Sequence, residues 1–112
     1  MDTIKLITEI NLALQESDNF AVKYYEGQSD RIADTKYVLN LLRQEIQLGK
    51  GENTNERILR AMHDIGMSAF KEYENSPLEE AIGKVTGILY REIPSYKNLK
   101  PLRMDFGKGD PI

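Results

Sequence analysis

The stretch SPLEEAIGKVTGILYREIP, residues 76–94, contains the signals that decide the fold. Ser76 is of a residue type preferred at a helix N-cap, and Pro77 suits the first helical position, where its missing N–H leaves no bond unmade. Glu79 completes a capping box. In this motif the serine side chain accepts a hydrogen bond from the glutamate N–H, and the glutamate side chain accepts one from the serine N–H. The closing proline cannot continue a helix. The stretch therefore predicts a helix over residues 77–93.

Three further segments place apolar residues at the 3.6-residue spacing of an amphipathic helix. They cover residues 3–16, 30–48 and 55–74. The second is apolar on two sides, as expected of a central helix, and Gly49 suits its C-terminal end. No segment alternates apolar and polar residues long enough to form a sheet. We therefore predict an all-α fold, a compact bundle of about four helices within residues 1–93, as a single domain.

Residues 18–26 fit two structures. The positions of Phe20 and Tyr24 suit both a short helix and a strand. Asp18 is a suitable helix cap and Gly27 a suitable end, which favours the short helix. The strand stays open as an alternative.

Composition narrows the class of protein. The 112-residue chain is 40% hydrophobic and 29% charged, as in folded soluble domains, and has a net charge of −3. It contains no cysteine, which excludes disulfides, thiolate metal sites and thiol catalysis. Thr8, Glu9 and Asn11 interrupt the apolar residues near the N-terminus, so we expect neither a signal peptide nor a membrane span. We expect a soluble, cytoplasmic protein.

The helix predicted over residues 55–74 carries His63, the only histidine. Asp64 cannot support it as a catalytic base, because adjacent helical residues point about 100° apart. We interpret His63 as a structural, half-buried residue at the border of the apolar face. The polar residues of this helix that we expect to face water are Arg60, Asp64, Ser68 and Lys71.

Sites for metals and phosphates lack their usual ligands. Zinc needs cysteines or several histidines, and neither is present. The two GKG stretches, residues 49–51 and 107–109, lack the preceding strand and the following Ser or Thr of a phosphate loop. We expect no catalytic residue, no metal ion and no cofactor.

Residues 94–112 form a tail whose prolines exclude helix over most of its length. Leu102, Met104 and Phe106 alternate with charged residues such as Arg103, which is the period of an extended chain with one buried side. The tail is therefore predicted to pack on the bundle or on a partner.

Gly83 and Gly87 stand about one helical turn apart, away from the apolar stripe of their helix. Each glycine inside a helix costs up to about 1 kcal/mol relative to alanine. The pair, next to Tyr90, indicates either tolerated surface glycines or a groove where another backbone approaches, and the tail is the nearest candidate. The candidate binding residues are Gly83, Gly87, Tyr90, Leu102, Arg103, Met104 and Phe106.

These observations favour a non-catalytic protein-binding module, such as a small helical regulator, inhibitor or immunity-like protein. Its partner would be another protein or a second copy of the chain, and no membrane. One alternative is a small enzyme that uses carboxylates and His63 in a cleft. Another is a nucleic-acid-associated protein that uses the tail, although scattered basic residues and a pI near 5.2 argue against nucleic acid as the main ligand.

Overall fold

The computed structural model describes residues 2–23 and 29–104. In this part of the chain there are four α-helices and two 3-10 turns, and no strand. The elements in order are α1 (Thr3–Lys23), α2 (Ser29–Gln47), η1 (Gly51–Asn53), α3 (Glu56–Glu72), α4 (Pro77–Glu92) and η2 (Tyr96–Asn98). The predicted all-α fold is confirmed, and the bounds of the last three helices agree with the prediction to within two residues.

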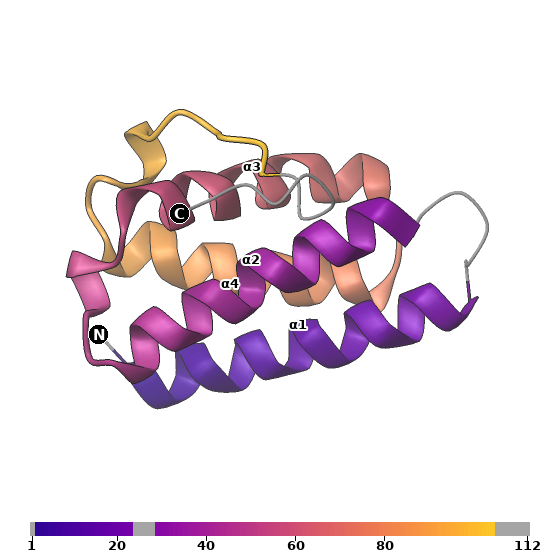
Figure 1. Cartoon of the computed structure of the whole chain (residues 1–112), viewed down its shortest axis with the longest axis horizontal. Helices are drawn as coiled ribbons and strands as arrows, with labels where there is room; N and C mark the ends of the chain where they lie inside the picture. The colour runs from indigo at the N-terminus through magenta and orange to yellow at the C-terminus, as the bar shows by residue number, and fades with distance from the viewer. Residues whose placement is uncertain (1, 24–28, 105–112) are drawn as a thin grey trace.

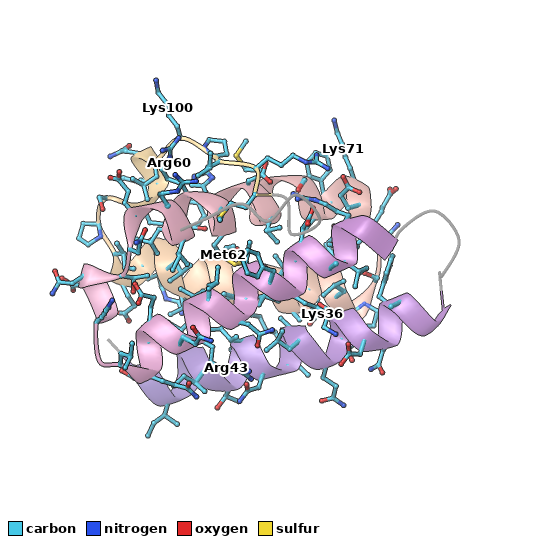
Figure 2. The ribbon with its side chains drawn as sticks, in the orientation of Figure 1. Lys36, Arg43, Arg60, Met62, Lys71 and Lys100 are labelled. Atoms are coloured by element: carbon cyan, nitrogen blue, oxygen red, sulfur yellow. The ribbon has the colours of Figure 1, made fainter. Side chains whose placement is uncertain are left out.

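The helices form an antiparallel bundle. Successive helices run in opposite directions and pack side by side, and α4 returns to pack against α1 (Figure 1). Their apolar stripes meet in the interior, where Leu39, Met62 and Leu89 are fully buried. Figure 2 shows Met62 among the helices. No helix within the described residues combines the length and the apolar character needed to cross a membrane.

α1 is longer than its prediction. Ser17 is fully buried, and its hydroxyl donates to the Ala13 carbonyl at 2.8 Å, so this polar side chain is satisfied inside the helix and does not end it. Asp18 caps no new helix, because it lies inside α1, and its carboxylate pairs with Lys36 of α2 at 2.6 Å. The predicted end at residue 16 is therefore wrong.

Phe20 continues the inner side of α1 and packs edge-on against Tyr73, with ring centroids 5.0 Å apart. Over residues 18–23 the chain is neither a separate short helix nor a strand, since it belongs to α1. Gly27, the predicted end of the short helix, lies outside the described residues.

The predicted helix-end signals act nearly as expected. Ser76 caps α4, and its hydroxyl accepts a bond from the Glu79 N–H at 3.2 Å. The Glu79 carboxylate accepts from the N–H of Asn75, one residue before the cap. Gly49 follows α2 with a φ of +78°, the left-handed conformation that suits glycine after a helix.

A buried arginine joins α2 to α3. The Arg31 guanidinium donates to the Asp64 carboxylate at 2.6 Å and to the Ser68 hydroxyl at 3.1 Å. Asp64 and Ser68 therefore face α2, and the expectation that they face water is wrong. Because a buried charge without a partner is strongly destabilising, this contact restricts how α2 and α3 can slide along each other.

Tyr73, the residue that ends α3, adds a second polar link to α2. Its hydroxyl donates to the Arg31 carbonyl at 3.1 Å and lies 2.6 Å from the Thr35 hydroxyl. Burial raises the pKa of Tyr73 to about 12. The Tyr73 side chain is therefore a neutral phenol in the folded chain.

α3 and α4 approach each other closely at Gly66. A Cβ atom at this position would lie 2.7 Å from the Thr86 methyl carbon, closer than side chains pack. At Gly83 of α4, by contrast, a Cβ would meet no atom of the described residues within 4 Å. Of these two glycines, the one that a neighbouring side chain approaches closely is therefore Gly66, on α3.

The chain after α4 packs along α3. The Leu102 N–H donates to the Arg60 carbonyl at 3.1 Å, and the Arg60 Nε donates to the Lys100 carbonyl at 2.9 Å. Tyr96 is fully buried and Met104 is 2% exposed. Figure 1 shows this yellow segment passing over α3.

We predict opposite effects for alanine at the two glycines. Gly83→Ala should raise the free energy of unfolding by about 0.5–1 kcal/mol, since alanine favours helix and the space is open. Gly66→Ala should lower it by about 1–2 kcal/mol through overpacking against Thr86. Urea denaturation of both variants measures the difference.

Thr86→Ser is the control, because it removes the contacting methyl group and keeps the hydroxyl. Combined with Gly66→Ala, it should recover most of the lost stability. Equal stabilisation by alanine at both glycines would contradict the close approach.

Candidate functional site

A groove with a volume of about 380 Å³ runs between α3 and α4. We call it the α3/α4 groove. Four of its residues come from α3, two from α4 and one from η2. They are His63, Gly66, Met67, Phe70, Thr86, Tyr90 and Tyr96.

Three side chains of the groove are large, apolar and exposed. Met67 is 52% exposed, Phe70 58% and Tyr90 46%. A cluster of such side chains on one surface is typical of interaction sites, whereas single exposed ones are ordinary. Elsewhere in the described residues, the exposed large hydrophobic residues are Ile4, Leu12 and Leu48, all on α1 or just after α2.

His63 and Tyr96 form the buried side of the groove. His63 is 8% exposed and Tyr96 is fully buried. The His63 ring centroid lies 5.1 Å from that of Tyr96 and 5.9 Å from that of Tyr90, and the two tyrosine rings meet edge-on at 5.0 Å. These are favourable separations for aromatic rings. The three rings thus support the groove from within.

Hydrogen bonding contributes little to this ring cluster. His63 Nε2 lies 3.5 Å from the Tyr90 hydroxyl, at the outer limit of a hydrogen bond. His63 Nδ1 and the Tyr96 hydroxyl are buried and have no hydrogen-bond partner among the described residues. Burial raises the pKa of Tyr96 above its ordinary value of about 10. Ring packing therefore holds the cluster together.

The described lining of the groove contains no acidic residue beside His63. A catalytic histidine is usually oriented by a carboxylate, and no Asp or Glu among the described residues lines this groove. The neighbouring Asp64 side chain is bonded to Arg31. Within residues 2–23 and 29–104, no three His, Cys, Asp or Glu side chains lie together so as to hold a metal ion.

Gly83 and Gly87 line a second groove, on the side of α4 that faces α1. Its volume is about 450 Å³. Among the described residues, a Cβ on Gly87 would approach only the Arg91 guanidinium, at 3.8 Å, so no backbone of this part of the chain lies over either glycine. The full lining is Lys5, Glu9, Glu80, Gly83, Lys84, Gly87, Ile88 and Arg91.

The tail does not cross this second groove within the described residues. Its path is set by Tyr96, which is buried beside His63 and so directs the chain over α3. Leu102 is partly buried, Arg103 is exposed and Met104 is buried in the core. Phe106 lies outside the described residues. Among the residues predicted to bind a partner, Tyr90 lines the α3/α4 groove.

Sequence reasoning missed most of this groove. Met67 and Phe70 lie beside the buried stripe of α3, which includes Met62 and Ile65. The apolar surface of this helix is therefore wider than its buried neighbours cover. That width is a signal in the sequence, but no binding surface was predicted from it.

Comparison of the chain with models of known protein families, with characterised proteins and with solved structures finds no significant match.

Two tyrosine substitutions test the polar description of the bundle. Tyr73→Phe should lower the free energy of unfolding by about 1–2 kcal/mol, because it removes hydroxyl contacts to Thr35 and Arg31. Tyr96→Phe removes a buried hydroxyl without a partner, so the change should stay within about 0.5 kcal/mol or be stabilising. Thermal denaturation at neutral pH compares them. Similar losses in both variants would mean that the Tyr96 hydroxyl is bonded.

Proposed function

We propose that the protein is a non-catalytic protein-binding module and that the α3/α4 groove is its binding surface. The observation that carries the proposal is the cluster of Met67, Phe70 and Tyr90, three large side chains that remain exposed around one groove. Covering them would remove apolar surface from water at about 25 cal/mol per Å², the main favourable term in protein association.

The residue types suit a protein partner. Tyrosine, phenylalanine and methionine are enriched at the centres of protein interfaces, where charged residues are depleted. Within the described residues, the lining of the α3/α4 groove contains all three types and no Lys, Arg, Asp or Glu. The ring cluster of His63, Tyr90 and Tyr96 would keep this surface in place before binding, which reduces the ordering cost of association.

In this proposal the protein is a small cytoplasmic regulator or inhibitor that masks a surface of its partner. The absence of cysteine fits a reducing compartment. A second copy of the chain is the other candidate partner, since the same three exposed side chains of Met67, Phe70 and Tyr90 could pair across a twofold axis.

Affinity capture with matched surface variants tests the proposal. The wild-type chain, Phe70→Asp and Ile4→Asp are expressed in the producing cells, and bound proteins are quantified by mass spectrometry. Both replaced side chains are exposed, Phe70 in the groove and Ile4 on α1. A partner should be retained by wild type and Ile4→Asp and lost about tenfold or more with Phe70→Asp.

Identical sets of bound proteins for all three chains would overturn the proposal. Sedimentation of the same chains separates the two candidate partners. A dimer that Phe70→Asp converts to a monomer would make the partner a second copy.

A further inference from the structure

Charge is distributed unevenly around the α3/α4 groove. α3, α4 and residues 94–104 together carry eight basic and six acidic side chains, whereas the rest of the chain has seven basic and twelve acidic ones. One of these six acids, Asp64, is already paired with Arg31 of α2. The groove therefore lies on the basic side of an acidic protein.

Four of these basic residues are near groove residues along the chain or through a hydrogen bond. Arg60 precedes His63 by about one helical turn, and its guanidinium bonds the Lys100 carbonyl. The Lys71 ammonium lies 5.7 Å from the ring centroid of Phe70, and Lys97 follows Tyr96 in η2. Figure 2 shows the Lys71 and Lys100 side chains projecting outward on the α3 side of the molecule. We call Arg60, Lys71, Lys97 and Lys100 the basic rim.

The basic rim makes no salt bridge within the described residues. Basic residues elsewhere do: Lys36 pairs with Asp18, Lys50 with Glu45 and Lys84 with Glu80. Among the described residues, four other cations (Arg31, Lys36, Lys50 and Lys84) have an acidic partner, whereas the four of the basic rim have none. Exposed charges of one sign beside an interface select a partner of the opposite sign.

Resting on the function proposed above, we infer that the α3/α4 groove binds an acidic segment of another protein that carries a large apolar or aromatic side chain. That side chain enters the groove between Phe70 and Tyr90. There an aromatic ring can pack edge-to-face against either ring, and the Met67 sulfur can contact it. Flanking Asp or Glu residues of the segment then meet the basic rim.

An acidic peptide fits better than a nucleic acid. Nucleic-acid surfaces place many cations along a continuous stripe to match the phosphate spacing. Here the described lining residues of the groove include no charged one, and the whole chain has a net charge of −3.

Selection from a phage-displayed library of random linear peptides against the purified full chain tests this inference. The enriched peptides should contain Asp or Glu around an aromatic or large aliphatic residue. Fluorescence anisotropy of the best labelled peptide should show about tenfold weaker binding to Phe70→Asp. Binding should also weaken several-fold as salt rises from about 50 to 300 mM.

Charge reversal supplies the matched control. Lys71→Glu with Lys97→Glu changes two exposed cations of the basic rim, and Lys5→Glu with Lys84→Glu changes two exposed cations at the second groove. Both double variants have the same net charge. The first should weaken peptide binding about tenfold and the second less than twofold.

The outcomes separate this inference from the proposed function. Two results would overturn the inference that the bound segment is acidic and leave the groove as a binding surface. One is that the peptides depend on Phe70 but lack acidic residues, and the other is that they bind both double variants equally. No enrichment over an unrelated protein also overturns it. Tighter binding of labelled duplex DNA than of the selected peptides would make the basic rim a nucleic-acid contact. Binding unaffected by Phe70→Asp would contradict the groove itself.

Discussion

The rest of the structure depends on α3 being held on three sides. α2 holds it through the buried Arg31 guanidinium, which Asp64 and Ser68 bind. α4 approaches it at Gly66, where only a hydrogen fits opposite Thr86. The C-terminal segment forms hydrogen bonds with the first half of α3, through the carbonyl and the side chain of Arg60. The α3/α4 groove lies on the part of α3 that these contacts leave exposed.

These three contacts differ in what they contribute. A buried ion pair adds little net stability relative to apolar packing, since desolvation offsets its attraction, but losing one partner is severe. Arg31 therefore specifies the register of α2 on α3 more than it stabilises the bundle. The contact at Gly66 sets how closely α4 can lie, and so how wide the neighbouring groove is. The position of Tyr96 then decides which side of α4 the following chain covers.

Local signals in the sequence predicted the bounds of the helices better than they predicted the contacts between helices. Ser76 and Gly49 act on neighbouring backbone, so α2 and α4 could be bounded without knowledge of the fold. Ser17 was misjudged because whether a serine ends a helix or bonds the preceding turn depends on what surrounds it, and here it is buried. Asp64 was placed toward water because its partner, Arg31, is 33 residues away in sequence.

At the candidate site, too, the sequence did not predict which helices are in contact. Two glycines one turn apart on α4 suggested a close approach, and within the described residues a neighbouring helix approaches Gly66 on α3. Helical spacing gives the face of a residue but not which helix lies opposite. Tyr90 was predicted for its place beside the α4 glycines and lies instead at the α3/α4 groove.

Packing of the C-terminal segment on α3 is the central claim, because it buries Tyr96 and so completes the α3/α4 groove. Amide hydrogen exchange of the Leu102 N–H, which donates to the Arg60 carbonyl, tests it most directly. In dilute monomeric protein this amide should exchange orders of magnitude more slowly than in an unstructured chain, with protection close to that of the α3 amides. Exchange at the unstructured rate, or protection that appears only at high protein concentration, would contradict the account.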